Sequence, residues 1–461
     1  RDAWVTALSA VEPRALSVTI APSVWMHDQM VETVEHVLRA AVDPVSDKRM
    51  HVCMLGYERE LLKTESAAFA RVSSLATSHT SLSAIVLARV PEDVELERDG
   101  LHVRAFAGRS FHRVYQAMRA GIRDARRLPG RTIISAQDPF AAGWIGYVIS
   151  RFTNQSLEIQ EHGDFWSGEW VKERITHRVW SVAGLILLRR AERVRVVSER
   201  VKEHLIARGI SSGKIEVIPV AQDIEDLFAH SVASLKDGQS FTFIAPCRFV
   251  AQKGLNVLLE AFALLRARGV EARLVLAGSG PLELWLRATI DAKQLTTHVD
   301  IRGWMSSQDL WEDAHGFVLS SRYEGWGRTI VEAMAAGVPV VTTDVGCVGS
   351  FFRPDVDGLM VPIGDTVALS KAMEKMISNV PARERMRDAA RKRARTLAPR
   401  EMLHEAQRGG WSKMLQETSA EKEGTRFELW VWAFGIFSIA SRGLSVILFH
   451  NQLLNREWGF Y

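Results

Sequence analysis

The sequence has 461 residues, of which 47% are hydrophobic, so it is long enough for two or three domains with cores of ordinary size. Its charge is nearly balanced, with 58 Lys and Arg residues against 54 Asp and Glu residues and a net charge of +4. This balance argues against a dedicated nucleic-acid-binding protein, which usually concentrates far more positive charge. The three cysteines, Cys53, Cys247 and Cys347, show no metal-ligand spacing and fit a reduced, cytoplasmic compartment.

In the first 130 residues, the alternation of predicted strands and helices is less regular than in the rest of the chain. Strands are predicted at residues 15–21 (ALSVTIA) and 50–57 (MHVCMLGY), with a helix at residues 30–40 between them. From about residue 130, short apolar β-branched runs alternate with helical stretches of 10–20 residues, which is typical of a parallel, doubly wound sheet. A polar stretch at residues 228–240 interrupts this rhythm, which then resumes at residue 241. The sequence therefore predicts two open α/β domains in series, with a ligand site in the cleft between them.

The segment EGWGRTIVEAMAAG, residues 324–337, predicts a glycine-rich turn followed by a helix that ends at a glycine. Gly325 and Gly327 would let backbone N–H groups approach a ligand, and the helix N-terminus would suit a phosphate. Glu324 and Glu332 are separated by about 12 Å of helical rise, whereas a retaining glycosidase needs its two carboxyl groups about 5 Å apart. The two glutamates are therefore expected to hold different parts of one extended ligand.

A second cluster of candidate residues follows the predicted strand at residue 241. Arg248 and Lys253 lie in a strand-to-helix loop, where two cations could neutralise a diphosphate or could simply be surface charges. The segment LAGSGPL contributes Gly278 and Gly280 at another strand end, although it lacks the third glycine of a dinucleotide-binding motif.

Together, R-x4-K-G, AGSGP and E-x7-E resemble the pattern of glycosyltransferase family 4, whose members have the GT-B fold. The likeness is dense over residues 241–378 and looser over residues 131–219. It implies a retaining, hexosyltransferase-type enzyme that uses a nucleotide-diphosphate sugar such as a UDP- or GDP-sugar. The acceptor would be a glycan or glycolipid of cell-surface polysaccharide biosynthesis, and neither a metal nor another cofactor would be needed.

The resemblance also implies roles for individual residues. Glu332 would bind the ribose hydroxyls, Glu324 would bind the donor sugar and support its developing positive charge, and Arg248 and Lys253 would stabilise the leaving diphosphate. Further donor contacts are expected from Gly325, Trp326, Gly327, Arg328, Thr329, Ile330, Gly278 and Gly280. His162, in EHGDFW, matches the family's cleft histidine, and Asp138 either orients the acceptor or caps the helix that follows it.

The implied architecture is α/β, with two Rossmann-like doubly wound domains that face each other across a cleft. Residues 1–225 would form the acceptor-binding domain, 226–240 a linker, and 241–400 the nucleotide-sugar-binding domain. Residues 401–420 would form a helix that returns to the first domain, before a hydrophobic tail at 421–461. Thirteen uncharged residues, 429–441, make the tail a candidate for membrane contact, a helix packed on the protein being the alternative. The expected location is the cytoplasm or the cytoplasmic face of a membrane.

Some features depart from the family pattern or imitate another one. The loop after the first predicted strand, residues 21–28, has no glycine where the family often has two. Val220, Ala221, Gln222 and Asp223 replace the usual N-G-V-D. Asp355 and Asp357 spell a metal-binding D-x-D motif but lie in a turn signal. Alternative functions are a sugar-nucleotide epimerase with a similar frame and a non-catalytic, membrane-bound scaffold.

Overall fold

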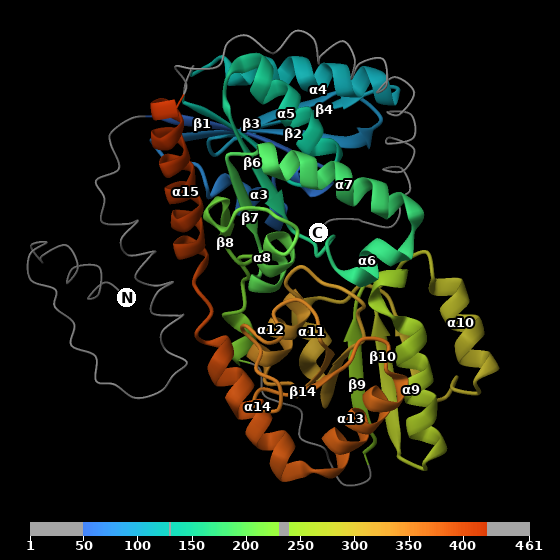
Figure 1. The fold of residues 1–461 in the computed structure, drawn as a ribbon. Helices are drawn as coiled ribbons and strands as arrows, with labels where there is room; N and C mark the ends of the chain where they lie inside the picture. Colours follow the sequence, from blue (N-terminus) through green and yellow to red (C-terminus); the bar gives the residue numbers. More distant parts are fainter. Residues whose placement is uncertain (1–48, 129–130, 230–238, 422–461) are drawn as a thin grey trace, which may run out of the picture. The chain divides into compact units, whose positions relative to one another are not determined.

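A computed structural model describes residues 49–128, 131–229 and 239–421 of the chain. These residues form two sheets of mostly parallel strands, each covered by helices (Figure 1). The predicted α/β fold class is therefore confirmed. The expected tail at 421–461, apart from residue 421, and the predicted strand, helix and loop at 15–40 lie outside the described residues.

The first sheet has eight strands in the order β3-β4-β2-β1-β5-β6-β7-β8. Its strands are β1 (Met50–Gly56), β2 (Thr80–Val90), β3 (Val94–Arg98), β4 (Leu101–Ala107), β5 (Thr132–Ala136), β6 (Ser156–Glu161), β7 (Arg193–Val196) and β8 (Ile215–Val217). All of its pairings are parallel except that of β3 with β4. In a parallel sheet every carboxyl end lies at the same edge, so the loops after β1, β5 and β6 lie close together.

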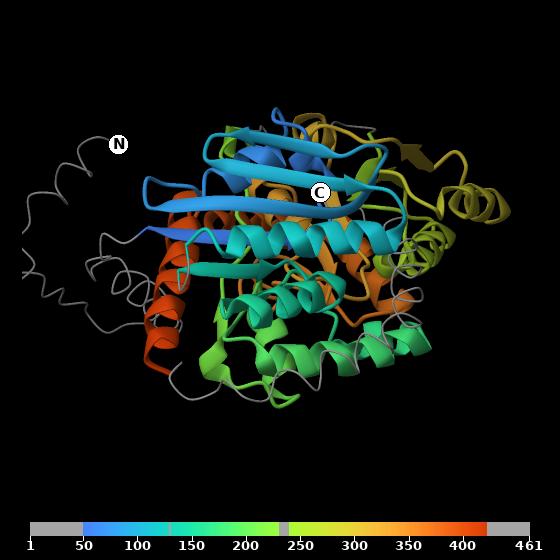
Figure 2. The same cartoon turned by 90° about the horizontal axis from the view of Figure 1, so that it is seen from above.

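Helices cover both faces of the first sheet because the side chains of each strand alternate in direction. In β1, Cys53 and Leu55 join the core beneath α4 (Ser110–Ala125), α5 (Ala141–Thr153) and α7 (Ile175–Arg190). Val52 and Met54 instead join a second core with α3 (Ala67–Ser73). Figure 2 shows α4, α5 and α7 side by side. The remaining elements of this domain are η1 (Arg59–Leu62), α6 (Gly168–Glu173), α8 (Glu199–Ile206) and η2 (Ser212–Lys214).

The second sheet has six parallel strands in the order β11-β10-β9-β12-β13-β14. Its strands are β9 (Phe241–Pro246), β10 (Ala272–Ala277), β11 (Val299–Arg302), β12 (Gly316–Leu319), β13 (Val340–Thr343) and β14 (Leu359–Val361). Its helices are α9 (Leu255–Ala267), α10 (Glu283–Ala292), α11 (Ser307–Glu312), α12 (Arg328–Ala336), α13 (Thr366–Ser378) and α14 (Val380–Ala394), with short 3-10 turns η3 (Asp226–Ala229) and η4 (Ala251–Lys253). The turn η3 occupies the start of the expected linker.

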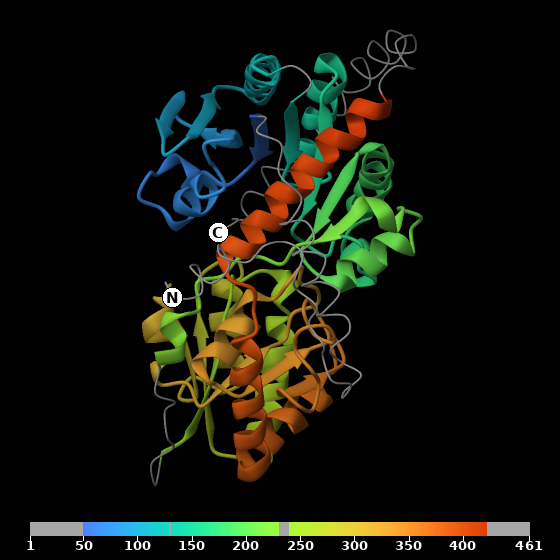
Figure 3. The same cartoon turned by 90° about the vertical axis from the view of Figure 1, so that its left-hand side faces the viewer.

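The last described helix, α15 (Arg400–Glu421), packs on the first sheet although it follows the second one in sequence (Figure 3). The Trp411 ring is fully buried in the core of β1, β2 and β4. Its indole N–H donates to the Glu158 carboxylate of β6 at 3.0 Å, and the Gln407 amide donates to the same carboxylate at 3.0 Å. Arg193 of β7 also pairs with Glu158. A buried carboxylate therefore fastens α15 to the first sheet.

Among the described helices, none combines the length and the apolar character that crossing a lipid bilayer would require.

Candidate active site

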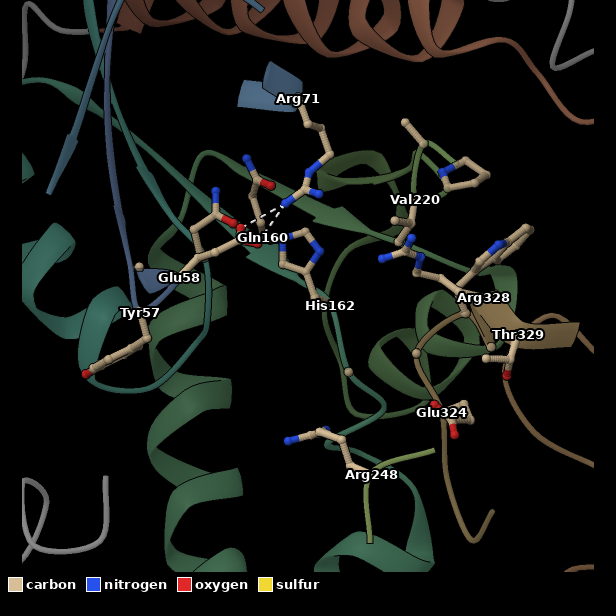
Figure 4. A pocket seen from close by; sticks show the side chains of 18 of the residues that line it. Tyr57, Glu58, Arg71, Gln160, His162, Val220, Arg248, Glu324, Arg328 and Thr329 are labelled. Atoms are coloured by element: carbon tan, nitrogen blue, oxygen red, sulfur yellow. Dashed lines mark hydrogen bonds and ion pairs between the residues drawn. The ribbon is translucent and has the colours of Figure 1, made fainter. Parts of the chain in front are cut away.

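A cavity of about 640 Å³ lies between the two sheets and is lined by loops at the carboxyl ends of their strands. From the first sheet it receives Gly56 at the end of β1, Asp138 after β5 and His162 after β6. From the second sheet it receives Arg248 after β9 and Glu324 after β12 (Figure 4). The site predicted for the cleft thus corresponds to a real cavity, and residues from both halves of the chain meet there.

Glu324 lies at the wall of the cavity in a network of strong contacts. Its carboxylate accepts a hydrogen bond from the Lys253 ammonium at 2.6 Å and another from the Ser321 hydroxyl at 2.7 Å. The two charged side chains are only 12% and 16% exposed. Charge-assisted hydrogen bonds of this length hold both groups in fixed positions. The structure therefore joins two residues that lie 71 positions apart, and Arg248 lines the same cavity.

The loops that carry this pair approach each other more closely than side chains would allow. Gly254, directly after Lys253, has φ +61° and lies against the Ser320 carbonyl, so an added Cβ atom would overlap that oxygen. The Ser320 hydroxyl also donates to the Lys253 carbonyl at 2.8 Å. Gly254 therefore explains why the R-x4-K-G motif ends in glycine.

The segment between Glu324 and α12 presents backbone to the cavity. A Cβ atom on Gly325 would overlap the carbonyl of His162, which belongs to the other domain. Gly327, with φ 85°, is the N-cap residue of α12, and no side chain in the described part of the chain caps this helix end. The cavity thus receives an uncapped helix N-terminus, which favours negative charge.

The remaining residues predicted on this segment divide into two groups. Arg328, Thr329 and Trp326 line the cavity, although most of the Trp326 side chain is buried in the domain core. The Ile330 side chain is fully buried, and its N–H donates to the Gly327 carbonyl at 2.9 Å. Ile330 does not line the cavity in this structure, because helix geometry turns it toward the core.

Glu332 lies one turn inside α12 and also lines the cavity. Burial raises the pKa of its carboxyl above the usual value, and the Arg328 guanidinium, 3.7 Å away, opposes this shift. The side chain is 19% exposed, so a ligand can still reach it. Glu324, in the loop before α12, and Glu332, inside this helix, therefore border one cavity.

The two glycines of the AGSGP motif have different roles. Gly278 lines the cavity and lies against the Cys247 carbonyl, where a Cβ atom would overlap. Gly280 packs against the backbone of Phe249 and does not line the cavity. Its close approach joins the loops after β9 and β10, so its role in this structure is packing rather than contact with the cavity.

His162 lies at the end of β6 with its ring at the cavity. Burial, together with the nearby Arg195 and Arg71 guanidinium groups, lowers the pKa of His162 to about 3. The buried ring nitrogen Nε2 has no hydrogen-bond partner among the described residues. At neutral pH the ring is therefore uncharged, and its buried Nε2 atom has a hydrogen-bonding position that no described residue fills.

Asp138 caps the start of α5, and its predicted role in orienting the acceptor stays a prediction. Its carboxylate accepts a hydrogen bond from the Phe140 N–H at 2.7 Å, at the start of α5, and it also lines the cavity. Burial raises the pKa of Asp138 to about 6, against the opposing effect of backbone hydrogen bonds from Phe140, Ala142 and Gly143. The cap is present, and the position also permits contact with an acceptor.

Residues that the sequence did not single out complete the side of the cavity formed by the first domain. Figure 4 shows the Arg71 guanidinium pointing to the Glu58 carboxylate, to which it donates two hydrogen bonds of 2.9 Å. Tyr57 and Arg195 also line the cavity. Tyr57 and Glu58 follow β1, a strand that the sequence did predict, so the loop after residues 50–57 was the available signal. Arg71 lies on α3 with no motif around it.

The strand end that reaches the cavity belongs to β1, where Gly56 lines the wall. The interpretation that placed the family's glycine loop at residues 21–28 is therefore not supported by the described residues. At the other departure from the family pattern, the Gln222 amide can accept from the Trp326 indole N–H at 2.8 Å and donate to the Arg328 carbonyl at 3.2 Å. The replaced segment thus supports the loop that follows Glu324.

Asp357 of the D-x-D sequence is fully buried, and its carboxylate pairs with Arg353 at 2.7 Å. Neither it nor Asp355 lines the cavity. The motif serves a turn, as its sequence context indicated.

Two parallel α/β domains that face a shared cavity with their strand ends define the GT-B class of glycosyltransferases. Comparison with known families agrees. The profile described as "Glycosyltransferase Family 4" matches residues 82–226, and that of "Glycosyl transferases group 1" matches residues 228–393, which together are more than half of the chain. The chain belongs to the group 1 glycosyltransferases of the family 4 type, and it is a glycosyltransferase.

Individual relatives are more distant. The chain is 27% identical over 267 residues to alpha-D-kanosaminyltransferase of Streptomyces kanamyceticus, covering 54% of this chain and 68% of that protein. It is 31% identical over 193 residues to the putative colanic acid biosynthesis glycosyltransferase WcaL of Salmonella typhimurium, covering 40% of this chain and 47% of that protein. Similar solved structures include sucrose-phosphate synthase of Thermosynechococcus elongatus, with TM-score 0.63 and 19% identity, covering 80% of this chain and all of that one.

Proposed function

We propose that the protein transfers a sugar from a nucleotide-diphosphate sugar to a glycan or glycolipid acceptor, with retention of anomeric configuration and without a divalent metal. The observation that carries the proposal is the Lys253–Glu324 pair beside the uncapped N-terminus of α12. A cation and a helix N-terminus suit the diphosphate, while the neighbouring carboxylate suits the hydroxyls of the attached sugar. The neighbour Anabaena Alr3699/HepE, with TM-score 0.60 and 18% identity, has been solved in complex with UDP-glucose, which agrees with this choice of donor.

In the proposed binding mode, the donor lies extended along the segment from Glu324 to Glu332. Glu332 accepts hydrogen bonds from the ribose hydroxyls, and Arg248, Lys253 and the first amides of α12 hold the diphosphate. Glu324 accepts hydrogen bonds from the donor sugar. Because Glu324 is already paired with Lys253 in this structure, the diphosphate would take over part of the lysine's hydrogen bonding when it binds.

The proposed reaction breaks the bond between the anomeric carbon and the diphosphate oxygen. The bonding electrons leave with the diphosphate, whose new charge is stabilised by fixed cations and helix amides. The acceptor hydroxyl attacks from the side of the leaving group and forms the new glycosidic bond, and its proton passes to the diphosphate. His162, neutral because of burial, would position the sugar or the acceptor rather than supply charge.

The first domain would bind the acceptor, because its part of the cavity is formed by side chains rather than by phosphate-binding backbone. Tyr57, Arg71, Asp138 and Arg195 are among the residues that line this part of the cavity. Membrane contact through residues 427–461 stays a prediction, since these residues lie outside the described part of the chain.

The proposal is tested by calorimetric titration with UDP and GDP, followed by NMR of the product formed with the donor that binds. We expect one nucleotide to bind wild-type protein and to bind Glu332→Ala more weakly. We also expect the product to keep the donor's anomeric configuration in the presence of EDTA. Inversion, or activity that EDTA removes and manganese restores, would reject the corresponding part of the proposal.

A further inference from the structure

The outer side of α7 exposes a continuous row of aliphatic side chains. Ile175, Val179, Val182 and Ile186 are between 38% and 80% exposed. Their spacing of four, three and four residues places them along one side of the helix. Ordinary amphipathic helices of globular proteins bury such a row, and here it faces solvent.

The neighbouring helices continue this apolar surface. Phe111 and Tyr115, one turn apart on α4, are 60% and 56% exposed, and Phe152 near the end of α5 is 64% exposed. The helix α5 contacts both α4 and α7, so the three helices form one layer over the first sheet (Figure 2). We name this layer, residues 110–125, 141–153 and 175–190, the α4–α5–α7 face. Exposed apolar patches of this kind mark interaction sites.

The charge of the α4–α5–α7 face is of one sign. Its exposed charged side chains are all arginines, namely Arg119, Arg123, Arg151, Arg178, Arg189 and Arg190. The single acidic residue of the three helices is Asp124, which is fully buried and paired with Arg104. In a chain with a net charge of only +4, the positive charge is thus concentrated on one helical layer.

We propose that the α4–α5–α7 face docks on an anionic membrane surface. Helices that combine a basic surface with exposed aliphatic and aromatic side chains bind at the lipid interface, where apolar groups enter the boundary of the acyl chains and cations meet the headgroups. A second copy of the chain fits less well, because a symmetric interface would bring arginines of both copies together without acidic partners. Nucleic acid fits less well, because the aliphatic row would face phosphates.

The α4–α5–α7 face is connected to the candidate active site through α6, the helix that precedes α7. The helix α6 directly precedes α7, and its Glu173 carboxylate accepts a hydrogen bond from the Tyr323 hydroxyl at 2.8 Å. Tyr323 is the neighbour of Glu324 in sequence. Docking through α7 would therefore hold the catalytic segment near the lipid headgroups, where a lipid-linked acceptor would be found.

The test uses the full chain and sedimentation with vesicles of phosphatidylcholine alone or of equimolar phosphatidylcholine and phosphatidylglycerol. We expect wild-type protein to bind the anionic vesicles and to be released by salt. The triple variant Arg119→Gln, Arg123→Gln, Arg178→Gln should lower the partition coefficient roughly a hundredfold, since each arginine near the surface accounts for roughly fivefold. The matched control, Lys371→Gln, Lys375→Gln, Arg385→Gln on α13 and α14, should bind like wild type.

A second pair of variants tests the apolar row separately. Val179→Gln with Val182→Gln should bind anionic vesicles severalfold more weakly, whereas Leu284→Gln with Val367→Gln, at exposed sites of the second domain, should not. The temperature of thermal unfolding should be unchanged in all four variants. The turnover of nucleotide sugar, measured without vesicles, should also be unchanged. Absence of vesicle binding by wild type would overturn the proposal. Equal binding by the charge variant, which would assign membrane contact to another segment, would also overturn it, as would a wild-type dimer that Val179→Gln with Val182→Gln dissociates.

Discussion

The two sides of the cavity differ in how their ionisable groups are held. On the side of the second domain they form ion pairs, as in Lys253 with Glu324 and Arg328 with Glu332, although burial raises the pKa of Glu332 above its usual value. In the first domain burial disfavours the charged form, because it lowers the pKa of His162 to about 3 and raises that of Asp138 to about 6. Paired charges suit a diphosphate that must be held while it gains negative charge. A buried neutral ring such as that of His162 suits hydroxyls, which need hydrogen-bond partners rather than counterions.

The largest effect is expected from breaking the charge pair of the second domain. Glu324→Gln keeps the shape of the side chain but removes the negative charge that faces Lys253. Turnover should fall by about 10²–10³-fold, the loss typical of one electrostatic contact to the transition state. Binding of the free nucleoside diphosphate, measured by titration, should change little because it lacks the sugar. Glu312→Gln, at an exposed site on α11, is the control, and equal turnover in both variants would contradict the pairing argument.

The buried carboxyl of the first domain should affect stability through pH. The pKa of Asp138 is raised from 3.8 to about 6, so the folded state binds the proton more tightly than the unfolded state does. This stabilises the protein below pH 4 and is lost as pH rises through 6, which amounts to up to about 3 kcal/mol. Asp138→Asn cannot ionise and can still accept the Phe140 N–H. It should therefore unfold at higher denaturant concentration than wild type at pH 8, and the difference should vanish near pH 4.

The same variant separates the two roles of Asp138. Turnover within severalfold of wild type would assign the residue to capping of α5. A much larger loss at unchanged or improved stability would assign it to the acceptor.

The contact between the two sides is tested at Gly325. A methyl group there would overlap the His162 carbonyl, so the domains would have to move apart. We expect turnover of Gly325→Ala to fall roughly tenfold to a hundredfold, because small displacements of reacting groups have effects of this size. An added Cβ at Gly303 meets no atom within 4 Å, so Gly303→Ala is the matched control. If both variants are equally active, the two loops are not in contact during the reaction.

The smallest effect is expected from the hydrogen bond between the domains at Tyr323. Its hydroxyl donates to Glu173 at 2.8 Å, and a hydrogen bond to a charged group contributes about 1.5 kcal/mol. Tyr323→Phe should lower the free energy of unfolding by about this amount. Arg322→Gln, whose pair with Glu169 is 35% exposed on both sides, should change it by less than about 1 kcal/mol. A larger loss in Arg322→Gln than in Tyr323→Phe would reverse this ranking.

The sequence singled out many residues on the second domain's side of the cavity, because that side depends on backbone. A loop that lies in contact with another main chain requires glycine at the point of contact. Glycines at fixed positions in a motif, such as Gly254 and Gly325, can be recognised in the sequence. Gly280 and Ile330 show the limit, since a motif includes residues that pack beneath the ligand as well as those that face it. Spacing alone does not distinguish them.

The other side was largely missed because its residues are distant in sequence and have no required spacing. Arg71 meets Glu58 only after α3 folds back on the sheet, and side-chain ion pairs tolerate many arrangements. The loop at Tyr57 was not singled out, because the family's glycine loop was expected after the strand predicted at residues 15–21, which lies outside the described part of the chain. The central position of β1 follows from strand pairing, which a pattern of apolar residues does not reveal.

The return of α15 to the first sheet limits how the cavity can open. The chain passes between the domains twice, once after β8 and once between α14 and α15. An ion pair of Arg400 with Asp223 joins the two crossings, and Arg391 donates to the Phe228 carbonyl near them. Because these two adjacent segments connect the domains, one domain can rotate about them as a hinge but cannot slide or twist freely against the other. Substrate entry and product release should therefore take place at the edge of the cavity farthest from Arg400.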